Sequence, residues 1–312
     1  MKNKRLRALR KHPVLDALRN PYFLRLWVGE LALSATMRMN GVAQGWLIYH
    51  LTGSALALGW IGSSWSITFS TLSLYGGVIS DRIEKRRLLC WTQGGMAVSA
   101  LVTTVLIATG AIQLWHLAAY ALMRGVFFAL MIPARRAMLA ELVDRTTLLN
   151  AVSLTSVGRG IAEIIAASLA GFLIDLWGGA SVYIGMTVLS LWVLFTLTRL
   201  PLTGHSDTDT SSVWSDLRMG LQYLKRHPIL LSLLGIAFAR GFLAMPYRTF
   251  MPKYAQDVME LDATGLGILS AAPGVGSLTS ALVMTSLGDF QHKGKVLLSA
   301  SALTGVSLAL FA

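Results

Sequence analysis

Between two long apolar segments the chain reads Gly77-Val78-Ile79-Ser80-Asp81-Arg82-Ile83-Glu84-Lys85-Arg86-Arg87. The last seven of these residues contain four cations and two acids, which are costly to place inside a lipid bilayer. A short loop at the cytoplasmic membrane surface accommodates them. The segment therefore predicts a membrane protein in which two spanning helices are joined by a charged cytoplasmic connection.

The composition supports this interpretation. Hydrophobic residues make up 54% of the 312 residues and charged residues only 13%, whereas soluble domains carry roughly 25% charged residues. We therefore expect an all-α, polytopic transmembrane bundle. Nine helices of about the length that spans a bilayer are expected at residues 24–49, 56–80, 88–109, 114–134, 150–176, 180–200, 229–251, 263–287 and 296–312.

The net charge of +12 does not predict a nucleic-acid partner, because the cations gather on alternate connections. Basic clusters precede the first expected helix and follow the second, fourth and sixth. The turns near residues 50–54, 109–114 and 177–181 contain no Lys or Arg. Because cytoplasmic loops of membrane proteins are enriched in Lys and Arg, the N-terminus is expected in the cytoplasm.

Two segments of the chain repeat at an offset of about 207 residues, as related halves of transporters do. Leu18-Arg19-Asn20-Pro21 precedes the first helix and Lys225-Arg226-His227-Pro228 the seventh, and the same offset brings Asp81 close to Asp289. The repeat predicts an N-terminal six-helix half, a cytoplasmic linker and the first three helices of a C-terminal half, at residues 1–200, 201–228 and 229–312.

The linker and the second half carry two further expectations. Trp214, Leu217, Leu221 and Leu224 recur at helical spacing, which predicts a short amphipathic helix on the inner membrane face. By analogy with the first half, three more helices are expected beyond Ala312. A nine-helix protein is the alternative.

With its loop pattern G-x-x-x-D-R-x-x-[KR]-R, its two halves and its linker, the chain resembles transporters of the major facilitator superfamily. Residues 19–27, 133–151 and 216–228 resemble the branch that includes siderophore exporters and macrolide-type drug efflux proteins. The resemblance implies a monomeric secondary transporter of a bacterial-type inner membrane that works by alternating access.

The resemblance also implies that the charged loop is a conformational latch. Gly77 would allow close approach of the eleventh helix, and Asp81 would face the positive end of its dipole. Further contacts are implied for Arg82, Lys85 and Arg86, and a degenerate second latch at Asp289. Glu84 stands where the family usually has Gly. The alternative is that the basic residues only fix the topology.

Charges inside the expected spans cost at least about 2.5–3.5 kcal/mol each, so each calls for a partner or a function. The resemblance places the first, fourth and seventh helices around a central cavity and the fifth beside it. The charges in these helices are Glu30, Arg38, Arg124, Arg159, Glu163 and Arg240, with Asp175 and Arg248 nearer the outer ends.

We expect Glu30 to be the proton-titrating carboxylate, tuned by Arg38 or Arg124, with the substrate competing for the site. Arg159 and Glu163 are spaced i, i+4 and are expected to pair. The alternatives are that Glu30 lies solvated at the inner interface and that the Arg159–Glu163 pair is structural.

These features predict a proton-coupled exporter of small organic compounds, drug or siderophore-like. A metabolite symporter or uniporter, a non-transporting receptor or scaffold, and a non-functional fragment are the alternatives. The sequence contains no G-x-x-x-x-G-K-[ST] pattern, which an ATP-driven pump would need. It also shows no Ser/His/acid set outside the apolar core, so an enzyme is not predicted. The single cysteine allows no disulfide within the chain. Small-molecule substrate, protons and lipid are the expected partners, and no cofactor or metal is expected.

Overall fold

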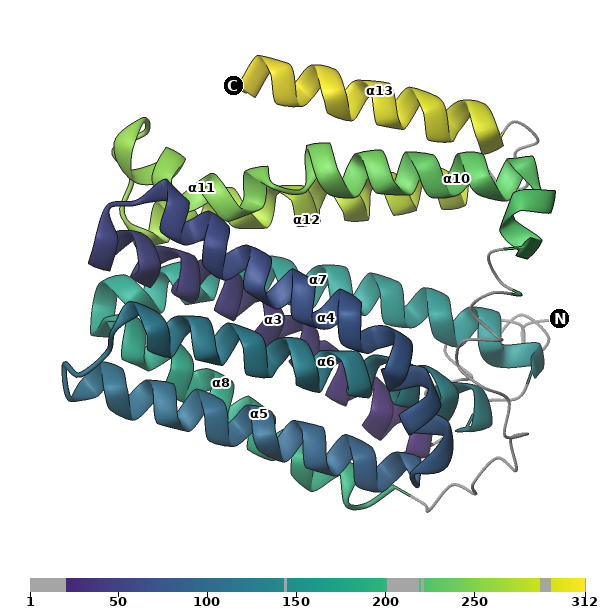
Figure 1. Ribbon diagram of the computed structural model, residues 1–312, viewed down its shortest axis with the longest axis horizontal. Helices are drawn as coiled ribbons and strands as arrows, with labels where there is room; N and C mark the ends of the chain where they lie inside the picture. Colours follow the sequence, from purple (N-terminus) through teal and green to yellow (C-terminus); the bar gives the residue numbers. More distant parts are fainter. Residues whose placement is uncertain (1–20, 143–144, 201–218, 220–221, 287–292, 312) are drawn as a thin grey trace, which may run out of the picture.

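The computed structural model describes residues 21–142, 145–200, 219, 222–286 and 293–311. Within these residues the structure contains helices at all nine expected positions and no strand. The N-terminal bundle consists of α3 Pro21–Thr52, α4 Ala55–Arg82, α5 Lys85–Ala108, α6 Leu114–Leu142, α7 Arg145–Trp177 and α8 Gly179–Leu197. The C-terminal group consists of α10 Pro228–Ala239, the π-helix η2 Arg240–Ala244, α11 Tyr247–Asp257, α12 Ala263–Ser286 and α13 Lys293–Phe311. Figure 1 shows α10, α12 and α13 on one side of the N-terminal bundle.

Five segments of the described chain are long and apolar enough to cross a membrane, and they are residues 85–108, 114–139, 154–177, 179–197 and 228–257. The helices α3, α4 and α12 contain 32, 28 and 24 residues, so they also reach the roughly 20 residues that a bilayer requires. Polar residues interrupt their apolar surface. The all-helical, membrane-spanning architecture expected from the sequence is confirmed.

Small residues allow the helices of the N-terminal bundle to approach closely, as is usual where lipid removes the hydrophobic force between helices. The clearest case is Gly76 of α4, where an added Cβ would lie 2.1 Å from the backbone oxygen of Ala129 in α6. Gly95 of α5 lies under the ring of Phe127, which an added Cβ would meet at 2.3 Å. The backbones of α4 and α6 therefore pack in direct contact.

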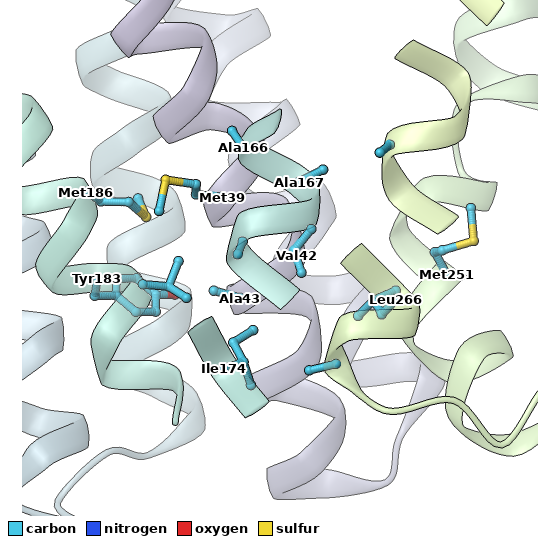
Figure 2. Close-up of a cluster of buried hydrophobic side chains, with 14 of the residues drawn as sticks. Met39, Val42, Ala43, Ala166, Ala167, Ile174, Tyr183, Met186, Met251 and Leu266 are labelled. Atoms are coloured by element: carbon cyan, nitrogen blue, oxygen red, sulfur yellow. The ribbon is translucent and has the colours of Figure 1, made fainter. Parts of the chain in front are cut away.

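The C-terminal group joins the bundle mainly through α7 and α12. A Cβ on Gly171 would lie 2.2 Å from the oxygen of Ala263, and one on Gly267 would lie 2.7 Å from the oxygen of Ala167. Figure 2 shows the buried cluster formed there by side chains of α3, α7, α8, α11 and α12. Because two backbones meet at these glycines, the register of α12 against α7 is tightly fixed.

The expected seventh helix is broken. It runs as α10 up to Ala239, continues as the π-helix η2, and resumes as α11 after Pro246. Proline has no N–H to donate and its ring clashes with the carbonyl one turn earlier. The backbone N–H of Met245 bonds to the oxygen of Arg240 at 3.1 Å, which is the wider π spacing. The helix expected over residues 229–251 is therefore present within the span 228–257, but η2 and Pro246 interrupt its α-helical hydrogen bonding.

Two predictions lie wholly or partly outside the described residues. Of the four residues that predict the amphipathic helix, Trp214, Leu217 and Leu221 fall outside, while residues 222–226 are helical. Asp289 also falls outside. The division of the chain at residues 200 and 229 stays a prediction.

Candidate functional site

The carboxylate of Glu30 pairs with an arginine that the sequence did not suggest. Nη1 of Arg135 in α6 donates to Oε2 of Glu30 at 2.8 Å. The two side chains are 8% and 19% exposed, and Nε and Nη2 of Arg135 are buried without a hydrogen-bond partner. The ion-pair partner of Glu30 is thus Arg135, whereas the sequence suggested that Arg38 or Arg124 tunes this carboxylate. The physical reason is that α6 continues past Pro133 to Leu142 and carries Arg135 alongside α3.

A second ion pair joins α3 to α7. Nε and Nη2 of Arg38 donate to Oε2 of Glu163 at 2.8 and 2.6 Å. The side chains are 29% and 23% exposed. Glu163 thus bonds across the helix interface rather than along its own helix, and Arg159, four residues away, is exposed. The predicted Arg159–Glu163 pair is corrected, because packing of α3 on α7 brings Arg38 closer to the carboxylate.

Arg124 lies apart from both pairs. Its guanidinium carbon is 5.7 Å from the ring centre of Tyr120 and 5.3 Å from that of Phe128. The residue is 9% exposed and lines a small cavity inside the N-terminal bundle, together with Thr36, Met186 and others. Cation–π contacts with two rings stabilise a desolvated guanidinium. Arg124 therefore belongs to the interior of the bundle.

A small groove opens between the bundle and the C-terminal group and has a volume of about 80 Å³. Arg38 enters it from α3 and Arg248 from α11. Nε of Arg248 donates to the hydroxyl of Tyr247 at 3.3 Å. The remaining lining residues are Met37, Gly41 and Val42 of α3, Met251 of α11, and Ser270 and Pro273 of α12.

The structure therefore does not gather the six predicted charges into one space. Of these, only Arg38 lines the groove, with Glu163 bonded to it. Arg240 lies on η2, is exposed, and is not among the lining residues. Sequence reasoning did not identify Tyr247 and placed Arg248 only near an outer end. The signal that points to both is Pro246, which breaks the helix directly before them.

The charged connection between α4 and α5 is very short. It consists of two residues, Ile83 and Glu84. The carboxylate of Glu84 accepts from the backbone nitrogens of Arg86 and Arg87 at 3.1 and 2.9 Å and so caps α5. This gives a local structural reason for an acid at a position where the family usually has Gly.

The residues predicted for the latch have different surroundings. Lys85 is buried and pairs with Glu141 of α6, inside the N-terminal bundle. Gly77 faces open space, because a Cβ added there would meet nothing within 4 Å. Arg82 is exposed and Arg86 partly buried, while the side chain of Asp81 is outside the described set.

Two hydrogen-bonded contacts connect the bundle to the C-terminal group where α3 and α7 end. Asp175 accepts from the backbone nitrogens of Ala263 and Thr264 at 3.2 and 2.7 Å. The hydroxyl of Tyr49 donates to Oδ2 of Asp257 at 2.5 Å. These contacts close this end of the interface.

Comparison with known proteins agrees with this architecture. A family model described as transmembrane secretion effector matches residues 13–312. The staphyloferrin A transporter of Staphylococcus aureus is 24% identical over 92% of the chain and 70% of its own length. The enterobactin exporter of Salmonella typhi is 26% identical over 98% of this chain and 72% of its own length. Macrolide efflux protein A of Streptococcus pyogenes is 20% identical, over 92% and 72%.

A solved structure shares the fold. The crystal structure of a mutant of the nucleoside transporter NupG matches with a TM-score of 0.67 at 12% identity, covering 85% of this chain and 67% of that one. The predicted resemblance to siderophore exporters and macrolide-type efflux proteins is confirmed. The chain belongs to the transmembrane secretion effector family of the major facilitator superfamily, and it is an integral, multi-pass membrane transporter rather than an enzyme.

Proposed function

We propose that the protein exports small organic compounds, drug or siderophore-like, in exchange for protons across a bacterial-type inner membrane. The N-terminus lies in the cytoplasm, as the distribution of Lys and Arg indicates. Relatives named as a siderophore transporter, a siderophore exporter and an efflux protein support the direction. The observation that carries the proposal is the Arg38–Glu163 pair, which places a carboxylate beside the groove between the two helix groups.

The pair allows a simple exchange. Deprotonated Glu163 holds Arg38, whereas protonation of Glu163 removes the charge that neutralises the guanidinium. A substrate group in the groove then competes with the carboxylate for Arg38, so that proton and substrate occupancy become linked. Rocking of the bundle against the C-terminal group would expose the groove to alternate sides.

The two ends of the interface would control this motion. Outer opening breaks the contacts of Asp175 with Thr264 and of Tyr49 with Asp257. At the cytoplasmic end we retain the predicted latch of Gly77, Asp81, Arg82, Arg86 and Asp289. The open surface at Gly77 supports it, because close approach of another helix needs such a surface. Lys85 would act on the latch indirectly, by fixing α5 against α6 through Glu141.

Everted membrane vesicles test the coupling. An imposed pH gradient should drive accumulation of a fluorescent efflux substrate such as ethidium by the wild type. We expect Glu163→Gln to abolish the part of this accumulation that depends on the pH gradient, because a neutral amide cannot exchange a proton. Glu260→Gln is the matched control, since Glu260 is an exposed acid in the turn before α12. Unchanged gradient-driven transport by Glu163→Gln would reject this carboxylate as the proton site.

Glu30→Gln tests the sequence-based assignment in the same vesicles. Its pair with Arg135 does not line the groove, so a folded Glu30→Gln variant should retain gradient-driven transport. Loss of that transport, with Glu163→Gln still active, would assign the proton to Glu30 instead.

A further inference from the structure

We propose that the groove between α3, α11 and α12 binds the anionic group of an organic substrate, and that Arg248 is the residue that recognises it. The inference deepens the proposed export function and rests on it for the identity of the ligand as a substrate. It concerns the chemical class of the substrate, namely carboxylates and related organic anions rather than cationic or neutral compounds.

The charges of the groove point to an anion. Its lining residues include two guanidiniums, of Arg38 and Arg248, and no carboxylate. Arg38 has its charge neutralised by Glu163. The hydrogen bond and the ring contact of Arg248 within the described residues both go to Tyr247, which is uncharged. Because the exposed guanidinium of Arg248 forms no ion pair with a described carboxylate, it can stabilise an anion that enters the groove.

The geometry at Arg248 suits a carboxylate. Its guanidinium carbon lies 5.9 Å from the ring centre of Tyr247, and Nε donates to the hydroxyl of that ring. The terminal nitrogens make no hydrogen bond within the described part of the chain. A guanidinium presents parallel donors that match the two oxygens of a carboxylate. The hydroxyl of Tyr247 fixes Nε and leaves these donors for the ligand.

The other walls favour an organic ligand over an inorganic ion. Met37, Val42 and Met251 give the groove apolar sides, and methionine side chains adapt to irregular apolar shapes. A Cβ on Gly41 would meet nothing within 4 Å, so this glycine leaves the groove open. The volume of about 80 Å³ suits the anionic group of a ligand and lies below that of sites that enclose a whole small molecule.

The break in the seventh helix explains how Arg248 reaches the groove. The π-helix η2 and Pro246 precede α11 directly, and π-helical turns shift the direction in which the following side chains point. The same proline weakens the continuity of the helix. Tyr247 and Arg248 are therefore on the segment of the helix that contacts α3.

Calorimetric titration of the purified full chain in detergent micelles tests the assignment, with 2-naphthoate and its neutral isostere 2-naphthamide as probes. We expect naphthoate to bind about tenfold more tightly, the gain typical of one charge-assisted hydrogen bond. Arg248→Gln should remove that difference without changing naphthamide binding. Arg248→Lys should restore only part of it, because lysine keeps the charge but not the paired donors.

Three further variants distinguish the effect of charge in the groove from the effect of the groove's shape and from loss of folding. Arg199→Gln is the control, because Arg199 also lies over an aromatic ring, that of Phe195 at 4.1 Å, but outside the groove. It should leave both affinities unchanged. Gly41→Leu should weaken both probes, since it fills the groove without altering charge. Glu163→Gln should tighten naphthoate binding, because it frees Arg38. Thermal unfolding of each variant verifies its fold.

The proposal is overturned if naphthoate does not bind, if it binds no better than naphthamide, or if Arg248→Gln retains the difference. The binding assay needs no transport, so it separates this inference from the export function. Gradient-driven efflux by a protein that does not bind naphthoate would refute the anion-binding inference and leave the export function in place. Naphthoate binding as expected, with no gradient-driven transport of any compound, would remove the export function and leave an anion-binding membrane protein.

Discussion

Thr264, in the first turn of α12, donates its backbone N–H to the carboxylate of Asp175 in α7 at 2.7 Å, and so ties the C-terminal group to the N-terminal bundle. The N-terminus of a helix carries unpaired N–H groups and a partial positive charge. A carboxylate supplied by another helix satisfies both. We expect Asp175→Ala to destabilise the start of α12 by about 1 kcal/mol, seen as faster hydrogen exchange over residues 263–266.

Asp262→Ala is the matched control for this prediction. Asp262 accepts from the backbone nitrogen of Gly265 at 2.7 Å and therefore caps the same helix locally. Both variants should speed exchange at the start of α12. Only Asp175→Ala should also raise maleimide labelling of a cysteine placed at the buried Leu266, in a Cys90→Ser background. Equal labelling in the two variants would show that the Asp175 contact does not hold the interface closed.

Two adjacent glycines of α4 should respond in opposite ways to alanine. A Cβ on Gly76 would lie 2.1 Å from the oxygen of Ala129, whereas one on Gly77 meets nothing within 4 Å. Gly76→Ala should lower stability by about 1–3 kcal/mol, as overpacking does. Gly77→Ala should stabilise the fold by about 0.5–1 kcal/mol, because alanine is the better helix former. Thermal unfolding in detergent micelles measures both.

The same pair of variants tests the latch. If Gly77 contacts another helix during transport, Gly77→Ala should slow gradient-driven efflux although its fold is intact. Full transport by that variant would argue that Gly77 makes no such contact and that the basic residues of this segment fix the topology.

The sequence predicted the positions of the helices better than the side-chain contacts between them. Each of the nine expected helices is present, because a run of about 20 apolar residues has one stable state in lipid. The break at η2 was missed, although Pro246 marks it, because hydropathy does not register a lost backbone hydrogen bond.

Ion pairs were harder to predict for a different reason. Spacing along one helix suggested Arg159 for Glu163, but contacts between helices depend on their register and rotation. These are set by packing at positions such as Gly171 and Gly267. Arg135 was missed because Pro133 favoured a loop where α6 continues.

Glu84 should be worth more to folding than an average surface acid. It accepts two backbone N–H groups at the start of α5 and is 8% exposed. Glu84→Ala should therefore cost about 1 kcal/mol of stability, whereas Glu84→Gly should cost only about a few tenths, because glycine is tolerated at helix N-caps. Thermal unfolding of the two variants checks the order. Equal losses would indicate that the carboxylate does not act as a cap.

The two membrane ion pairs should differ in their contribution to stability. The partner of Glu30 is 8% exposed, whereas the partner of Glu163 is 29% exposed. Removal of Glu30 leaves a buried, unneutralised guanidinium on Arg135, and such losses cost about 3–5 kcal/mol. Removal of Glu163 leaves Arg38 in the groove, where water can solvate the guanidinium or an anionic substrate group can neutralise it. We therefore expect Glu30→Ala to destabilise the protein more than Glu163→Ala in thermal unfolding.

A double-mutant cycle identifies the cause of the loss. Arg135→Met in the Glu30→Ala background removes the unneutralised charge and should recover a large part of the lost stability, because coupled buried charges are strongly non-additive. Additive losses would show that Glu30 contributes through contacts other than Arg135. A smaller loss for Glu30→Ala than for Glu163→Ala would contradict the assignment of the Glu30 pair to structure and the Glu163 pair to transport.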